Sequence, residues 1–349
     1  MKKYNFVVFA DSDGTLRNSN LQVSERTRRV ISDLEDMGVA VVICTGRPRF
    51  QNRKISSSCC ASKYMVSSNG ADVYDAYNER NISAIGISDD IVREFYNSAN
   101  SNNFKLLIGT GDVEFCNIAE PNTATQVFLK DGIDSIRGKN IFQCHFSIQG
   151  IDKGNESWRT DAIEEIKEFL DFAENDKEFE VLLKKMGINS FEELVSLGEE
   201  KLIGVIRLIR FYRLKCFLNS ILSKYGQQLS IGNLAPEFTD YKETSENPWF
   251  TITSKNISKA FGVRKICEYL DVPLSHTISI GDGYNDRELL ASTNISVCMG
   301  NGSEEQKKTA DIVTKSNDED GAAIVLEQLK NMLRGRLNIH SLRDIIVDR

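Results

Sequence analysis

The stretch Phe6-Val7-Val8-Phe9-Ala10-Asp11-Ser12-Asp13-Gly14-Thr15 decides the fold. Its first five residues are a continuous apolar run rich in valine and phenylalanine, which is typical of a strand buried on both faces of a parallel sheet. Asp11 and Asp13 follow at once, where open α/β sheets bind ligands. Two carboxylates at one strand end need a cation, so the stretch predicts a site for a divalent metal such as Mg²⁺. Taken alone, it is equally typical of a solvated turn.

A second predicted strand, Val39–Cys44, ends in the same manner. It is followed by Thr45, Gly46 and Arg47, and then by Pro48. A threonine hydroxyl and an amide freed by glycine can donate hydrogen bonds to phosphoryl oxygens without adding bulk. In isolation, the segment is explained as well by a strand-to-loop turn that Pro48 ends.

Two further segments lie far away in the chain. Lys259 stands in the first turn of a predicted amphipathic helix, where the helix dipole disfavours a cation, so it either points to water or meets an anion. The run from His276 to Ile280 ends in Gly281-Asp282-Gly283, with Asp286 close behind. Asp282 can complete an oxygen shell for a metal. A dinucleotide loop is disfavoured, because Asp286 stands where the third glycine belongs.

These four segments resemble the signatures of the haloacid dehalogenase superfamily of phosphotransferases, and within it the Cof-like subfamily IIB of sugar phosphatases. The segment Val66-Ser67-Ser68-Asn69-Gly70-Ala71 is also similar to the family pattern, as is the closing stretch 310–321. The resemblance covers about residues 1–85 and 250–330. Two positions depart from it, because Ser12 replaces an apolar residue and Ala260 a glycine.

The resemblance implies a role for each reacting residue. Asp11 is the expected nucleophile, which attacks phosphorus and becomes an aspartyl phosphate. Asp13 is expected to protonate the leaving alkoxide and then to activate water. Thr45 and Lys259 complete the expected catalytic set, with Lys259 offsetting the charge on the nucleophile and the phosphoryl group.

The resemblance also implies binding residues. The expected cofactor is Mg²⁺, held by Asp11, Asp282 and the backbone carbonyl of Asp13, with Asp286 orienting Lys259 or a metal-bound water. The expected phosphate ligands are Ser12 and Gly46 through their amides, Thr45, Lys259 and Asn285. Arg47 and Asn69 are candidate substrate contacts, although an arginine there is more often a surface ion pair and an asparagine before glycine a turn.

The predicted architecture is α/β, with a Rossmann-like doubly wound parallel-sheet core and an inserted α+β cap. We expect residues 1–84 and 250–333 to form the catalytic core, 85–249 the cap that selects the substrate, and 334–349 a C-terminal extension. The chain is expected to return to the core with Trp249–Thr253, and Gly109–Asp112 to be a hairpin turn. Helices are predicted at 25–37, 89–100, 160–174, 177–198, 210–224 and 319–333, strands of the cap at 104–109, 124–129, 203–208 and 227–231, and a loop at 150–156.

Composition limits the possible partners. The chain has 349 residues, 41% of them apolar, and a net charge of −7. No basic run is long enough for a nucleic-acid backbone, and no apolar run approaches a membrane span or a secretion signal. The eight cysteines form no C-x-x-C pair, which indicates reduced thiols in the cytoplasm. We expect a monomer or a small homo-oligomer.

The predicted function is a Mg²⁺-dependent phosphatase that hydrolyses a small phosphorylated metabolite, with a sugar phosphate as the expected substrate. Two alternatives stay open. A phosphomutase would reuse the aspartyl phosphate, and a receiver-like signalling module would store it. Asp13 argues against the receiver, because a lasting phospho-aspartate gains nothing from a proton carrier beside it.

Overall fold

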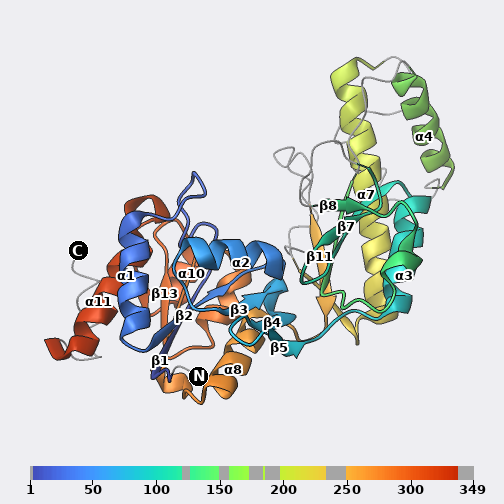
Figure 1. The fold of residues 1–349 in the computed structure, drawn as a ribbon. Coiled ribbons are helices and arrows are strands. Elements are labelled where there is room, and N and C mark those ends of the chain that lie inside the picture. The colour runs from blue at the N-terminus through green and yellow to red at the C-terminus, as the bar shows by residue number, and fades with distance from the viewer. Residues whose placement is uncertain are drawn as a thin grey trace.

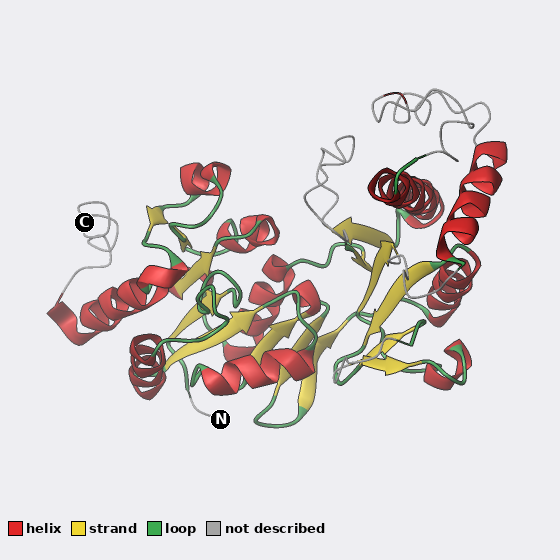
Figure 2. Ribbon diagram, turned by 90° about the horizontal axis from the view of Figure 1, so that it is seen from above, coloured by secondary structure: helices red, strands yellow, loops and turns green. Residues whose placement is uncertain are grey.

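The structure is a computed structural model that describes residues 3–119, 126–148, 157–172, 184, 197–232 and 249–336. Its described part contains an eight-stranded and a six-stranded sheet, each covered by helices (Figure 1). Seen from above, the two sheets lie apart and are joined by connecting segments (Figure 2). The predicted α/β class is confirmed.

The eight-stranded sheet has the order β14-β13-β12-β1-β2-β3-β4-β5. The six strands from β14 to β3 run parallel, and β4 and β5 add an antiparallel hairpin at one edge. This is the doubly wound parallel core that the apolar runs predicted. The strands are β1 Phe6–Ala10, β2 Val39–Cys44, β3 Tyr64–Ser67, β4 Asp72–Asp75, β5 Arg80–Ala84, β12 Thr277–Gly281, β13 Ile295–Cys298 and β14 Ile312–Val313.

Successive residues of β1 explain why both faces of this sheet are covered. Phe6, Val8 and Ala10 are buried with the side chains of α1, α2 and α11, whereas Val7 and Phe9 are buried with those of α8. Figure 1 shows α1 and α11 lying side by side over their face. The helices are α1 Glu25–Asp36, α2 Arg49–Ser58, α8 Lys259–Leu270, α9 Arg287–Leu290, α10 Glu304–Thr309 and α11 Gly321–Asn331.

The six-stranded sheet has the order β10-β11-β9-β6-β7-β8. Helices α3 and α7 pack on one of its faces, and α4 packs against α7. Its strands are β6 Phe104–Gly109, β7 Glu114–Cys116, β8 Gln126–Phe128, β9 Gln143–Ile148, β10 Leu229–Gly232 and β11 Phe250–Ser254. Its helices are α3 Asp89–Ser101, α4 Trp158–Phe172 and α7 Glu199–Tyr225.

One expectation about the return of the chain was wrong. The strand that we expected to open the second part of the core, β11, pairs with β9 and β10 of the six-stranded sheet. Phe250 and Ile252 bury their side chains beside Phe146 and Cys144, so the alternating run extends this sheet by one antiparallel strand. The chain reaches the eight-stranded unit only after Ser254.

A second expectation, a strand at 203–208, was also wrong, whereas the helix expected at 210–224 is confirmed as part of a longer one. One helix, α7, spans both segments. The β-branched residues suggested a strand, but the buried positions Leu202, Val205, Ile206 and Ile209 recur at intervals of three and four and pack against α4. Packing outweighed local propensity here.

The other elements that the sequence predicted agree with the structure where they are described. Ser24 caps α1 by accepting a hydrogen bond from the Thr27 amide at 3.1 Å, as its position before the helix indicated. The turn at Gly109–Asp112 joins the antiparallel strands β6 and β7. The predicted helix at 177–198 and loop at 150–156 lie almost wholly outside the described residues, as does most of the extension 334–349. None of the described helices has the length and apolarity to cross a membrane.

Candidate active site

The four signature segments meet at one edge of the eight-stranded sheet. β12, β1, β2 and β3 are neighbours and parallel, so their carboxyl ends lie together. Asp282 follows β12, Asp11 follows β1, Thr45 follows β2 and Asn69 lies just past β3. The sequence could predict this meeting because each polar residue directly follows a buried strand.

Lys259 joins two of the acids. Its Nζ lies 2.5 Å from Asp11 Oδ1 and 2.6 Å from Asp286 Oδ1, and all three side chains are buried. Burial raises the pKa of Asp11 to about 7, although Lys259 acts in the opposite direction. Burial would lower the pKa of Lys259, but the two carboxylates raise it above its usual value. The ammonium is therefore held charged between two acids.

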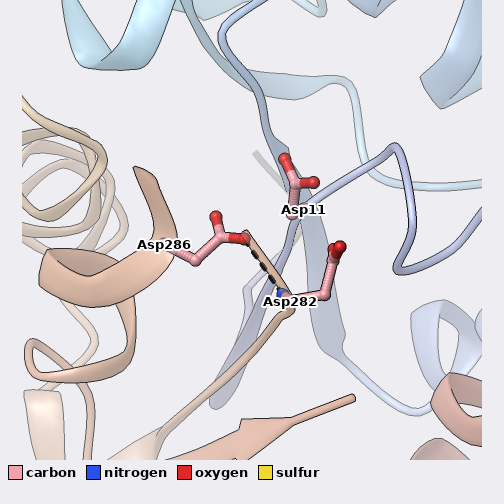
Figure 3. Close-up of side chains that lie close together, drawn as sticks. All are labelled: Asp11, Asp282 and Asp286. Carbon is pink, nitrogen blue, oxygen red and sulfur yellow. Dashed lines mark hydrogen bonds between the residues drawn. The ribbon is translucent and has the colours of Figure 1, made fainter. Parts of the chain in front are cut away.

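Asp282 and Asp286 are fixed by different partners. Asp286 Oδ2 accepts hydrogen bonds from the amides of Asp282, at 3.1 Å, and Gly283, at 2.9 Å; Figure 3 shows the first of them. The Thr15 hydroxyl donates to Asp282 Oδ1 at 2.6 Å. Burial raises the pKa of Asp282. Asp286 therefore orients both Lys259 and the loop that carries Asp282.

The acidic cluster fits a divalent cation. One oxygen each from Asp11, Asp282 and Asp286 lies within 4.8 Å of the others (Figure 3). When all three carboxylates are ionised, one ammonium leaves two negative charges uncompensated in a largely buried place, and hard oxygen ligands are those that Mg²⁺ prefers. The side chain of Asp13 is directed elsewhere, which is compatible with the expectation that this residue offers its backbone carbonyl.

Asp13 lies between two arginines. Its Oδ2 accepts from Arg47 Nε at 2.6 Å, and its Oδ1 accepts from Arg17 Nη1 at 2.7 Å. Burial would raise the pKa of Asp13, but the hydrogen bond and charge of Arg47, together with Arg17, lower it below its usual value. The carboxylate is therefore ionised in this conformation. Arg17 was missed in the sequence, although it stands four positions after Asp13.

Thr45 lies beside the acids and is buried. Its Oγ1 accepts from the Ser12 hydroxyl at 3.2 Å and from the Arg47 amide at 3.1 Å. The Asn69 side chain rests against Gly46, and its Oδ1 is buried without a hydrogen-bond partner in the described chain. Thr45, Gly46 and Asn69 are therefore grouped. Asn285, by contrast, is exposed on the turn after Gly283.

A chain of contacts leads from this site to the six-stranded sheet. Arg47 Nη1 donates to Gln51 Oε1 at 2.9 Å, and Gln51 Nε2 donates to Glu114 Oε2 on β7 at 3.4 Å. Beside it, the Phe50 amide donates to the Gly111 carbonyl at 2.9 Å. Gln51 and Glu114 could not be predicted from the sequence, because their proximity depends on how the hairpin β6–β7 meets α2.

Comparisons with known proteins identify relatives of this chain. The sequence profile of the haloacid dehalogenase-like hydrolases matches residues 8–215 and 212–326. The phosphatase YwpJ of Bacillus subtilis is 26% identical over 331 residues, which cover 93% of this chain and 99% of that protein. A second relative from the same organism, named 5-amino-6-(5-phospho-D-ribitylamino)uracil phosphatase YcsE, is 22% identical and covers 91% of this chain and 92% of its own.

Solved structures share the fold. A haloacid dehalogenase-like hydrolase from Bacteroides thetaiotaomicron superimposes with a TM-score of 0.64 at 17% identity, covering 94% of this chain and all of its own. A structure described as a subclass IIB sugar phosphatase gives a TM-score of 0.59 at 18% identity and covers 93% of this chain and 98% of its own. At these identities the similarity concerns the fold.

Proposed function

The chain belongs to the haloacid dehalogenase-like hydrolase family, and on that premise we propose that it is a Mg²⁺-dependent phosphatase of a small phosphorylated metabolite, acting through an aspartyl phosphate. The single observation that supports this most is the cluster of Asp11, Asp282 and Asp286 with Lys259 in contact with two of them. Within this proposal the eight-stranded unit is the catalytic core, the six-stranded unit is the cap, and the enzyme works in the reducing cytoplasm.

The chain's own groups divide the reaction into two steps. A carboxylate oxygen of Asp11 attacks phosphorus in line, and the bond to the leaving oxygen breaks as the aspartyl phosphate forms. Asp13 donates its proton to that oxygen, which leaves as an alcohol. Asp13 then removes a proton from water, whose oxygen attacks phosphorus and releases phosphate and free Asp11. Mg²⁺, held by Asp11, Asp282 and the Asp13 carbonyl, would supply charge neutralisation and orient the phosphoryl group.

The binding groups hold the phosphoryl oxygens. Thr45, the amides of Ser12 and Gly46, and Lys259 would donate hydrogen bonds to these oxygens. Asn285 would join them only after its turn moves inward. Lys259 is buried, and the two acids keep its ammonium charged. It would therefore offset negative charge at Asp11 without a movement of its side chain.

Asp13 must lose one of its arginines before it acts as an acid, because a carboxylate with a lowered pKa does not carry a proton. We assign this exchange to Arg47, which is partly exposed and whose guanidinium binds phosphate oxygens well. An incoming phosphoryl group would draw Arg47 away from Asp13, so binding of the substrate would prepare the acid.

Phosphate release tests the proposal. Wild type is assayed with and without Mg²⁺ on p-nitrophenyl phosphate, on sugar phosphates and on the substrate named for the relative YcsE. We expect Asp11→Asn to lower kcat by at least about a thousandfold with the fold intact, since it removes the attacking charge and keeps the shape. Asp36→Asn, an exposed position on α1, is the matched control. A wild type that releases no phosphate from any of these compounds would exclude the proposed function.

Family membership favours hydrolysis over storage of the phosphoryl group, so the receiver-like alternative loses its support. A phosphomutase would differ in its product. Formation of an isomeric phosphate ester, without free phosphate, would replace the proposed phosphatase by that activity.

A further inference from the structure

A pocket of about 380 Å³ lies at the far end of α2 from the candidate active site. It is bordered by the last turns of α2, by the turn that leads into β3, by Met65 on that strand and by Ala76 after β4. Helix α2 begins at Arg49 and has 10 residues, so the two ends of the helix are about 15 Å apart. The pocket is therefore separate from the place proposed for the phosphoryl group, and its volume suits a small molecule.

The segment that builds most of the pocket has an unusual charge. The chain has 50 Asp and Glu residues and a net charge of −7, yet none of the residues 37–71 is acidic and five of them are Lys or Arg. Arg47 and Arg49 form ion pairs with carboxylates. Arg53, Lys54 and Lys63 form no ion pair within the described part of the chain. This side of an acidic protein is therefore locally positive.

Two of these cations border the pocket and are held by aromatic rings. The guanidinium carbon of Arg53 lies 5.7 Å from the centre of the Tyr74 ring, and Lys63 Nζ lies 5.3 Å from the centre of the Tyr77 ring. A ring face attracts a cation but does not neutralise it, as a carboxylate would. Both charges are positioned at the pocket and stay available to an anion.

The remaining lining is apolar or carries hydroxyl groups. Met65 is buried, Ala61 and Ala76 are half-buried, and none of the described residues that border the pocket is acidic. The acid next to Ala76 in the chain, Asp75, accepts a hydrogen bond from the Tyr269 hydroxyl of α8 at 2.7 Å, and α8 covers the opposite face of the sheet. The pocket thus joins an apolar surface to two cations.

The end of a helix alone does not explain these two cations. The negative end of a helix dipole favours Lys and Arg in the last turn. Arg53, however, stands in the middle of α2, and Lys63 lies beyond its end. The carbonyls of Ile55 and Ser56 already accept hydrogen bonds from the amides of Cys59 and Ala61, at 2.9 and 3.0 Å.

We propose that this pocket binds a small organic anion that carries two negative charges on an apolar body. Arg53 and Lys63 match the two charges, and the side chains of Met65, Ala61 and Ala76 pack against the body. A phosphate ester and a dicarboxylate share this chemistry. The inference goes beyond the proposed function and does not depend on it, because no residue that borders the pocket takes part in phosphoryl transfer.

Cys60 offers a local reporter of binding. It borders the pocket and is exposed, and Cys216 on α7 is the other exposed cysteine. Cys60 also borders a second hollow beside α1, where Arg28 and Arg29 are accompanied by two acids. The mixed charge of the second hollow does not favour an anion, and a variant there separates the two places.

The experiment measures protection of Cys60 from alkylation. The full-length protein with Mg²⁺ reacts with neutral iodoacetamide, and mass spectrometry of the peptides gives the rates at Cys60 and Cys216. Phenylphosphonate, which has no ester bond to hydrolyse, and phthalate are the dianions; benzoate carries one charge on the same ring and benzyl alcohol none. We expect a dianion to slow the reaction of Cys60 at roughly millimolar concentrations, as its small size implies, and to leave Cys216 unchanged. Benzoate should need an about 3- to 5-fold higher concentration.

Variants assign the protection to this pocket. Arg53→Gln and Lys63→Gln should each raise the half-protecting concentration about 3- to 5-fold. Lys54→Gln makes a comparable change of charge at an exposed position of α2 outside the pocket, and Arg29→Gln makes one in the second hollow, so both should leave protection unchanged. Ala76→Leu fills the pocket, keeps both cations and should abolish protection.

Protection is the ratio of the rates with and without the anion in the same variant, so a change in the basal reactivity of the thiol cancels. Protection by only one of the two dianions supports the inference and identifies the charged group. Equal protection of Cys216, equal protection by benzyl alcohol, or an effect of Lys54→Gln as large as that of Arg53→Gln would overturn it. If neither dianion slows the reaction of Cys60, the inference fails, whereas the proposed phosphatase, which is tested by phosphate release, is unaffected.

Discussion

Gly14 lies so close to the carboxylate of Asp282 that no side chain fits between them. A Cβ at Gly14 would fall well inside van der Waals contact with Asp282 Oδ2, and the glycine has φ +77°, in the left-handed region. The loop after β1 and the loop after β12 are therefore matched to each other. Only glycine allows both the backbone conformation and the approach.

Gly14→Ala should displace Asp282 and weaken the cation site. We expect about a 10- to 100-fold higher Mg²⁺ concentration for half-maximal activity, as for other losses of ligand orientation. Gly132→Ala is the matched control, because Gly132 has φ +74° but open space around it. Both variants should lose about 1 kcal/mol of unfolding free energy from backbone strain. Equal Mg²⁺ dependence in the two variants would show that Asp282 is not a ligand.

Lys259→Met should destabilise the fold as well as abolish turnover. The substitution leaves Asp11 and Asp286 buried without their cation, and breaking such a cluster typically costs about 3–5 kcal/mol. Lys265→Met on the same helix breaks a surface pair with Glu268 and a contact of the ammonium with the Phe261 ring, and should change the unfolding free energy by less than about 1 kcal/mol. Urea unfolding in the absence of Mg²⁺ measures both. A wild-type midpoint for Lys259→Met would contradict the buried ion network.

Ser12→Ala tests the middle position of the first signature, where a serine replaces the apolar residue of the family pattern. The Ser12 hydroxyl is buried, and its single proton can reach Asp13 Oδ2 or Thr45 Oγ1, each at 3.2 Å. Its removal should raise the pKa of Asp13, because a hydrogen bond to the ionised carboxylate is lost. We expect kcat/KM to fall less than about 10-fold, since no reacting group is removed. The measurement is the pH–rate profile of kcat/KM, whose alkaline-side fall should shift to higher pH because Asp13 must carry a proton in the first step.

The sequence predicted the carboxyl ends of the core strands well because Asp11, Thr45 and Asp282 each follow a buried strand at once, whereas Lys259 opens helix α8 and follows no core strand. The carboxyl ends of neighbouring parallel strands lie at the same end of the sheet, so the residues that follow these strands come together. It did not predict Arg17 on Asp13 or Glu114 on Gln51, because these contacts depend on side-chain direction and on how two units meet. The six-stranded unit was harder to predict for another reason: the segment 203–208 has strand-like composition and becomes helical only through its packing on α4. The strand β9 was missed, although Gln143, His145 and Ser147 alternate with apolar residues and this alternation is itself a strand signal.

The stability of the fold towards acid should depend on His145. Burial lowers the pKa of this imidazole in the folded protein from 6.5 to about 4, so the unfolded chain binds one more proton between these values. Its contribution is therefore fully present above pH 6.5 and is lost as the pH falls towards 4. Asp72 and Asp11, whose pKa values burial raises to about 6 and about 7, change stability in the opposite sense over part of this range, so the total curve mixes the three groups. The difference between wild type and His145→Gln isolates the histidine, because glutamine can still bond to Thr251 and does not titrate.

We expect wild type to lose about 2 kcal/mol of unfolding free energy relative to the variant between about pH 7 and about pH 4.5. Urea unfolding curves across that range give the measurement, and parallel pH dependences for the two proteins would mean that His145 is protonated as readily in the folded sheet as in the unfolded chain.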